Sequence, residues 1–261
     1  MYLDLKFDRK LKLVTNRLLA SNEFHIGSGG KLAPVFLKGA RPTPWVFISH
    51  DVRKKYCWFW NRVCTQEFNL IPSHCRFSCW KVVIKPNNVK ELFKCYDILK
   101  ILDLPSKIGA DVRQYTYGPW AGFVYADTLE EGRKYYKIVR EAMPKKVEVI
   151  LKRGCTEMER IQDSDYWDVM GEKDLELEQR LQDLFAFDER FFRQARWLKN
   201  EIKEDWIRRA IEIGDPYARE MAEKLSNDPD IWKKLVVLSV PYHDETKDVG
   251  IYRPEEKKKE E

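Results

Sequence analysis

Two Trp-led stretches of the chain, WKVVIK and WAGFVY, begin the same order of apolar and polar positions forty residues apart. Their short apolar runs are typical of buried strands. Each run is followed by a capping residue placed three positions before a glutamate, a spacing that predicts the start of a helix. The two pairs are Asn88 with Glu91 and Thr128 with Glu131. A second apolar run, KIGADVR or VEVILKR, follows each helix. The expected order of elements is therefore β-α-β-β-α-β.

This order predicts an α+β fold whose core, over residues 75–155, is a duplicated ferredoxin-like βαββαβ unit. When the sequence is shifted by forty positions, six of 34 aligned residues are identical. They are Trp80 and Trp120, Glu91 and Glu131, Lys94 and Lys134, Tyr96 and Tyr136, Ile98 and Ile138, and Arg113 and Arg153. The alternative is that two unrelated βα segments match by coincidence.

The residues before this core, 1–74, predict strands and loops followed by a cysteine-bearing helix. The opening sequence MYLDLKF alternates polar and apolar residues, which indicates an amphipathic strand. The Gly-rich stretch HIGSGGK predicts a hairpin turn. From residue 51 to 68 apolar positions recur at helical spacing, until IPSH interrupts the pattern.

The residues after the core, 156–240, predict a helical region. Helices are expected over 172–186 and 188–213, and a last helix is expected to end near Leu238. The middle helix carries an apolar stripe at helical spacing, and we expect this stripe to cover the open face of the central sheet. Residues 241–261 end in PEEKKKEE and are expected to be partly disordered.

The composition narrows the class of protein. The 261 residues, of which 44% are apolar, are enough to bury a core. A net charge of +5 is too balanced to indicate nucleic-acid binding by itself. No apolar run approaches the roughly 20 residues that a membrane span needs, and the N-terminus lacks the apolar centre of a signal peptide. We therefore expect a cytoplasmic protein without a membrane partner.

Six cysteines in a chain of this kind indicate thiolate chemistry rather than a disulfide framework. Cys79 stands just before the first strand of the core, and Cys155 stands just after the last. These strands are neighbours in a ferredoxin-like sheet, so two cysteines 76 residues apart are expected to lie together. Cys75 is about one turn from Cys79, and the preceding helix carries Cys57 and Cys64 on one face.

Four thiolates at one corner would complete a site for Zn²⁺ or for a [4Fe–4S] cluster. The expected ligands are Cys64, Cys75, Cys79 and Cys155, with Cys57 in reserve. The irregular spacing and the neighbouring tryptophans favour the cluster, whereas zinc is the commoner metal at intracellular cysteine sites. The alternative is that the thiols are reduced core residues. That alternative is our interpretation of Cys95, which falls inside the first predicted helix.

The open face of the sheet is expected to carry lysines beside aromatic residues. The residues that alternate away from the helices include Lys81, Lys85, Phe123 and Tyr125. Ammonium groups beside aromatic rings can neutralise and stack single-stranded nucleic acid, as RNA-recognition sheets do. The segment GPWAGFVYA nevertheless matches the RNP1 pattern poorly. The alternative is that the C-terminal helices cover this face.

These features predict a metal- or iron–sulfur-cluster-binding protein that associates with nucleic acid and whose cysteine site is largely structural. Two alternatives stay open. One is an enzyme with a catalytic or redox-active [4Fe–4S] or zinc site, and the other is a structural or assembly subunit that docks a protein partner. A fold does not decide among these functions, and no motif in the sequence shows whether the protein is an enzyme.

Overall fold

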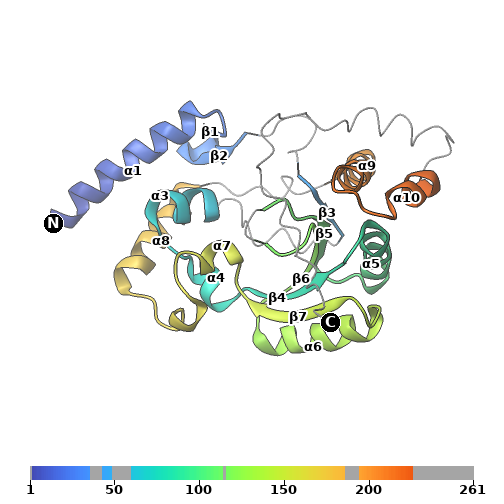
Figure 1. Ribbon diagram of the computed structural model, residues 1–261. Helices are drawn as coiled ribbons and strands as arrows, with labels where there is room; N and C mark the ends of the chain where they lie inside the picture. Colours follow the sequence, from blue (N-terminus) through green and yellow to red (C-terminus); the bar gives the residue numbers. More distant parts are fainter. Residues whose placement is uncertain (1, 36–42, 49–59, 114–115, 186–193, 226–261) are drawn as a thin grey trace, which may run out of the picture.

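A five-stranded antiparallel sheet lies at the centre of the protein (Figure 1). The computed structural model describes residues 2–35, 43–48, 60–113, 116–185 and 194–225. The strands, in their order across the sheet, are β3 (Trp45–Phe47), β5 (Ser106–Ala110), β6 (Trp120–Ala126), β4 (Trp80–Lys85) and β7 (Glu148–Arg153). Helices pack against this sheet, so the α+β class expected from the sequence is confirmed.

The two helices of the central region begin at the predicted capping residues. They are α5 (Val89–Leu102) and α6 (Leu129–Ala142). Asn88 Oδ1 accepts a hydrogen bond from Glu91 N at 2.9 Å. Thr128 Oγ1 accepts the corresponding bond from Glu131 N at 3.1 Å. In both helices the glutamate carboxylate also accepts a bond from the backbone N–H of the residue before the cap. A cap of this kind contributes about 1 kcal/mol to stability.

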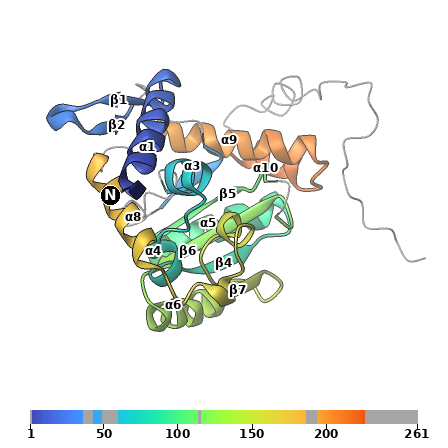
Figure 2. The same ribbon diagram turned by 90° about the vertical axis from the view of Figure 1, so that its left-hand side faces the viewer.

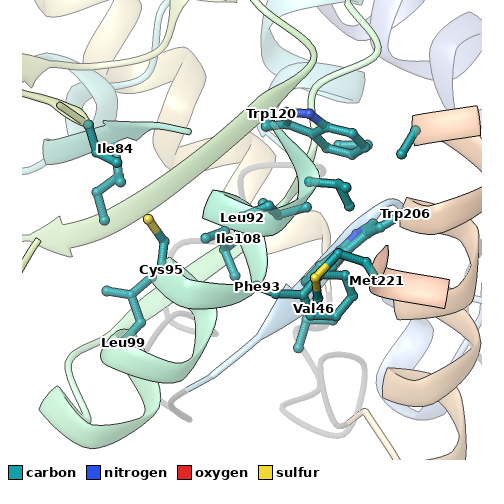
Figure 3. Packing of buried hydrophobic residues seen from close by; sticks show 14 of the residues in the cluster. Val46, Ile84, Leu92, Phe93, Cys95, Leu99, Ile108, Trp120, Trp206 and Met221 are labelled. Atoms are coloured by element: carbon teal, nitrogen blue, oxygen red, sulfur yellow. The ribbon is translucent and has the colours of Figure 1, made fainter. Parts of the chain in front are cut away.

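The main core lies between the sheet and α5. Figure 3 shows Leu92, Cys95 and Leu99 on the side of α5 that faces Ile84 of β4 and Ile108 of β5. All five side chains are fully buried. Burial of one such aliphatic side chain contributes about 1.5–3 kcal/mol. The contact between α5 and the sheet is therefore a major source of stability.

Helix α9 (Arg196–Glu212) packs beside α5 on this same face of the sheet. Trp206 is fully buried, and its ring contacts Phe93 and Tyr96 edge-to-face at centroid distances of 5.4 and 6.0 Å. Its indole Nε1 donates a hydrogen bond to Pro44 O at 2.8 Å. The expectation that the apolar stripe of this helix covers the open face is wrong. The stripe instead extends the layer that α5 and α6 form.

One aspartate joins the start of α5 to the turn between α9 and α10 (Ala218–Leu225). Asp215 Oδ2 accepts a hydrogen bond from Val89 N at 2.7 Å, and its Oδ1 accepts one from Tyr217 N at 3.0 Å. Gly214, with φ at 71°, lies just before it at the end of α9. A carboxylate at a helix start is favoured by the helix dipole. Gly214 thus follows the end of α9, and Asp215 holds the turn that leads to α10.

The N-terminal residues form a helix rather than the expected strand. Helix α1 (Tyr2–Ala20) carries Leu11, Val14 and Leu18 three and four positions apart, and all three contribute to one hydrophobic cluster. This spacing has the period of a helix rather than that of a strand. The strand prediction is therefore wrong, because the alternation in the first seven residues does not continue.

The cluster that contains α1 is separate from the main core. It also includes the hairpin of β1 (Phe24–Ile26) and β2 (Leu32–Pro34), which was predicted from the Gly-rich stretch, and α8 (Glu172–Leu184). The rings of Phe24 and Phe185 meet edge-to-face at 5.5 Å. Figure 2 shows α1, the hairpin and α8 on the same side of the molecule.

Short helical segments connect this cluster to the sheet. They are η3 (Trp60–Thr65), α3 (Gln66–Phe68), α4 (Ser73–Phe77), α7 (Thr156–Glu159) and η4 (Ser164–Tyr166). The helix expected over 51–68 is described only from Trp60 onwards. The last predicted helix and the tail lie outside the described residues. In the part of the chain that the structure describes, no helix is both long enough and apolar enough to cross a membrane.

Gly109 of β5 allows the edge strand β3 to approach closely. A Cβ atom at this position would lie 2.0 Å from Pro44 O. We therefore expect Gly109→Ala to displace β3 and to lower the free energy of unfolding by about 2–4 kcal/mol, measured by urea denaturation. Gly122→Ala on β6 is the control, because its added Cβ would meet its nearest neighbours at 3.4 Å. An equal loss in the two variants would contradict this explanation.

Candidate functional site

Four cysteines follow one another from η3 and α4 to the corner where β4 begins and β7 ends. They are Cys64, Cys75, Cys79 and Cys155, and we call them the cysteine corner. The pairing of Trp80 with Arg153 brings the two strand ends together, and Gly154 N donates a hydrogen bond to Cys79 O at 2.7 Å. The thiols of Cys79 and Cys155 also share a hydrogen bond. The expected proximity of these two cysteines thus agrees with the observed geometry.

The other two thiols continue from this pair as a series. The hydrogen bond with Cys155 is the main cause that raises the pKa of Cys79, and burial raises it further. Burial is the main cause that raises the pKa of Cys64, with a further rise from the nearby Glu178. A negative charge on Cys75 raises the pKa of both Cys64 and Cys79, so Cys75 is a neighbour of both. The thiols of Cys64 and Cys79 are therefore neutral at pH 7 in this structure.

The predicted ligands form a chain of neighbours rather than a closed coordination shell. Among the residues that the structure describes, no group of three or more His, Cys, Asp or Glu side chains is arranged to hold a metal ion. Cys57, the reserve ligand, lies outside the described residues. Cys95 is a core residue as expected, and its burial between α5 and the sheet raises its pKa to about 12.

A tryptophan that the sequence pattern did not single out closes the cysteine corner. Gly154 has φ at 64°, and a Cβ atom there would lie 2.2 Å from the Trp167 ring. Trp167 is fully buried and donates its Nε1–H to Gln162 O at 2.9 Å. Arg153 Nε donates to Arg76 O at 2.6 Å on the same side. The signal that could have revealed this packing is the glycine between the last strand residue and Cys155.

Lys81 links the cysteine corner to the open face of the sheet, which is the face away from α5 and α6. Its side chain is buried, and the ammonium group donates a hydrogen bond to Cys155 Sγ. The same Nζ lies 5.5 Å from the Tyr125 ring centroid and 5.9 Å from that of Phe123. Attraction to the rings and to sulfur offsets the cost of removing the ammonium group from water. The Lys81 charge also opposes the rise in the pKa of Cys79.

A second lysine on the open face lies beside two aromatic rings. Lys107 Nζ is 4.7 Å from the Trp45 ring centroid and 5.5 Å from that of Phe123. The two rings meet edge-to-face at 5.4 Å. We call Trp45, Lys107 and Phe123 the open-face cluster, and all three are partly exposed. Trp45 and Lys107 were not expected here, although the apolar run WVFI after the prolines is a signal for an edge strand.

The other residues predicted for nucleic-acid binding are less accessible. Tyr125 is buried, and the half-buried Lys85 donates a hydrogen bond to Tyr117 O at 3.0 Å. Burial lowers the pKa of Lys85. Lys152, which stands opposite Lys81 on β7, pairs with Glu159 at 2.5 Å. The accessible centre of the face is therefore the open-face cluster, with Lys85 at its margin.

A partly buried ion-pair network ties the end of β5 to α7, the helix that follows Cys155. Arg113 Nη2 lies 2.6 Å from Asp111 Oδ2, and its Nη1 lies 2.5 Å from Glu157 Oε1. Burial alone would raise the pKa of Asp111, but the hydrogen bonds and the charge of Arg113 outweigh burial and lower it. The ionised carboxylate of Asp111 thus helps to hold α7 beside the open face.

No family model, no curated protein and no solved structure matches this chain. The functional interpretation therefore starts from the chemistry of the two features just described. One is the series of thiols at the cysteine corner, and the other is the set of ammonium groups beside aromatic rings on the open face. Lys81 contacts both.

The contribution of Asp111 to stability is expected to depend on pH. Its pKa is lower in the folded chain than the ordinary value of 3.8, so the contribution is complete above 3.8 and is lost as the pH falls through the folded value. We expect Asp111→Asn to lower the free energy of unfolding by about 1–3 kcal/mol at pH 7.

Urea denaturation over a range of pH measures this difference. The gap between Asp111→Asn and the parent protein is expected to shrink as the pH falls below 3.8, because protonation removes the same charge from the parent. Glu130→Gln, at an exposed position of α6, is the control. A gap that stays constant down to low pH would contradict the role assigned to Arg113.

Proposed function

We propose that residues 80–153 are a ferredoxin-like unit made of two βαβ halves. The supporting observations are the chain order β4-α5-β5-β6-α6-β7 and the spatial order β7-β4-β6-β5, which places the fourth strand of the unit beside the first. The two Trp-led strands and the two capped helices also begin forty residues apart, at Trp80 and Trp120 and at Val89 and Leu129. Duplication would explain this common spacing.

We propose further that the protein binds single-stranded nucleic acid on the open face of this unit. One observation carries the proposal: the ammonium group of Lys107 lies beside the rings of Trp45 and Phe123, and all three side chains are partly exposed. Aromatic side chains on a sheet stack with bases of any sequence, while lysines neutralise the phosphate backbone. A lysine beside partly exposed aromatic rings is the combination of side chains that suits single-stranded nucleic acid.

The buried residues of the face have a supporting role in this proposal. Lys81 and Tyr125 are buried and stand opposite each other on β4 and β6. Lys81 Nζ lies 5.9 Å from the Phe123 ring centroid, so these two residues support the Phe123 ring rather than bind a base. Lys85 lies at the margin, where its pKa is lowered by burial but its ammonium group can still attract a phosphate. Because the net charge is only +5, the attraction is local to this surface rather than a property of the whole chain.

Binding to a fluorescent single-stranded oligonucleotide of about 12 nucleotides tests the proposal. Phe123→Ala removes one stacking platform, and we expect it to weaken binding by roughly ten- to a hundredfold, as the loss of about 1–3 kcal/mol per stacked base implies. Lys107→Gln should also weaken binding and should reduce its dependence on salt. Anisotropy titrations at several salt concentrations measure both effects.

The control for this experiment is Lys134→Gln on the exposed surface of α6. It removes the same charge as Lys107→Gln but lies on the helix side of the sheet. Equal affinity of the parent and Phe123→Ala for the oligonucleotide would refute the stacking role. An equal effect of the two lysine substitutions would show that only overall charge matters.

The cysteine corner supports a second candidate function, the binding of Zn²⁺ or a [4Fe–4S] cluster. The supporting observation is that four thiols follow one another as neighbours from η3 through α4 to the two strand ends. Zn²⁺ and the [4Fe–4S] cluster both require deprotonated sulfur ligands. The positive charge of a bound metal would stabilise these thiolates, although the pKa values of the free thiols are raised. Such a site would hold η3, α4, β4 and α7 together, so its role would be structural. Because the described residues contain no ready group of three or more ligands, the cysteine side chains would have to rotate towards a common centre to bind the metal.

Anaerobic purification, a visible spectrum and elemental analysis for iron, sulfide and zinc test this second candidate. We expect Cys79→Ser and Cys155→Ser to lose the metal and to unfold more easily, because each removes a ligand. Cys95→Ala is the matched control, since it lies in the main core and should cost only about 1–2 kcal/mol while retaining the metal. A parent protein without stoichiometric iron or zinc, or equal metal content in all three variants, would refute the assignment.

A further inference from the structure

A group of basic side chains gathers where the end of α5 meets the start of α9. Lys100 Nζ lies 5.4 Å from the Tyr96 ring centroid, and Lys203 Nζ lies 5.6 Å from the same centroid. Lys199 lies one helical turn before Lys203 and is half-buried like it, whereas Lys100 is exposed. Two helices thus place two ammonium groups beside one aromatic ring, and Lys199 lies close enough to both for their charges to interact. We call Lys100, Lys199 and Lys203 the lysine cluster.

The charges of the lysine cluster repel one another. Burial is the main cause that lowers the pKa of Lys199, and the charges of Lys100 and Lys203 lower it further. For Lys203, burial and the charges of Lys100 and Arg196 lower the pKa, and Asp97 is the acidic neighbour that opposes them. Arg196 and Lys199 also lie in the first turn of α9, where the helix dipole disfavours positive charge. A bound anion would relieve this repulsion.

The helix that carries Lys199 and Lys203 is joined to the edge strand that carries Trp45. Gln194, two residues before α9, accepts a hydrogen bond from Phe47 N at 2.7 Å and donates one to Trp45 O at 2.8 Å. It therefore ties the start of α9 to the outer edge of β3. Phe47 stands opposite Lys107, and Lys107 lies only five residues after the end of α5. The edge strand β3 thus lies between the start of α9 and Lys107 of β5.

We propose that the lysine cluster, together with Arg196, binds the phosphate backbone of a nucleic-acid strand that continues around the β3 edge from the open-face cluster. This inference rests on the proposed nucleic-acid function. A flexible strand can follow a path from one face of the sheet to the other, and lysines bind its phosphates as point charges. The bases stack on Trp45 and Phe123, and the backbone beyond them meets Lys199, Lys203 and Lys100.

Oligonucleotides of two lengths separate the two surfaces. A strand of about 6 nucleotides is intended to occupy the open-face cluster alone, and one of about 20 is long enough to reach the lysine cluster as well. The test variant is the triple substitution Lys100→Gln, Lys199→Gln and Lys203→Gln. The matched control is the triple substitution Lys134→Gln, Lys137→Gln and Lys145→Gln, at exposed positions of α6 and of the turn after it.

The salt dependence of binding is the quantity to measure. Each phosphate contact with a single strand contributes about 0.7 to the slope of log K against log salt, so loss of the cluster should reduce the slope by about 2 for the long strand. The slope for the short strand should not change. The control triple variant should keep both slopes. Thermal unfolding should show that the test variant is at least as stable as its parent, because like charges have been removed.

The possible outcomes separate this inference from the function on which it rests. If the parent protein binds neither strand, both proposals are overturned. If the parent binds and the test variant keeps its slope for the long strand, only the role of the lysine cluster is overturned. An equal loss for both strands also overturns it, because the cluster would then act through the open face. If the triple variant does not fold, the three single substitutions serve instead, each with an expected reduction of about 0.7 for the long strand.

Discussion

The antiparallel pairing of β4 with β6 on one side and β7 on the other is the constraint on which the rest of the structure depends. This register places Lys81 opposite Tyr125 and Lys152, on the face away from α5. A slip of one residue would turn Lys81 into the main core and Val82 out of it. A charged ammonium group among Leu92 and its neighbours would have no partner, and the cost would be several kcal/mol. Burial on both faces of β4 therefore fixes its alignment with β6 and β7.

The same register brings chemistry from distant parts of the chain into contact. Cys79 precedes β4 and Cys155 follows β7, so their meeting is a consequence of strand pairing and not of any local motif. Lys81 then connects this thiol pair to the aromatic rings of β6. The cysteine corner and the open face are thus parts of one continuous arrangement. A change in the charge of the Cys155 sulfur would directly alter the electrostatic environment of the Lys81 ammonium group, which lies near the Phe123 ring.

Local signals in the sequence were sufficient for the elements between residues 80 and 153. The caps at Asn88 and Thr128 act within a single turn, so their effect can be read from a few adjacent letters. The position of β3 could not be predicted in this way, because its partner β5 follows about sixty residues later in the chain. The apolar stripe of α9 likewise indicated that one side is buried but not what covers it. Tertiary packing decided both outcomes.

Gln194 has a further consequence for the behaviour of the protein in solution. On the outer side of β3 the backbone N–H of Phe47 and the C=O of Trp45 face away from the sheet, and an uncovered edge of this kind can pair with a strand of another molecule. The side-chain amide of Gln194 satisfies both groups in the way that a neighbouring peptide unit would. The outer hydrogen-bonding groups of β3 are thereby paired with the Gln194 side chain instead of with another strand. This protects β3 against edge-to-edge aggregation without a proline or a bulge in the strand.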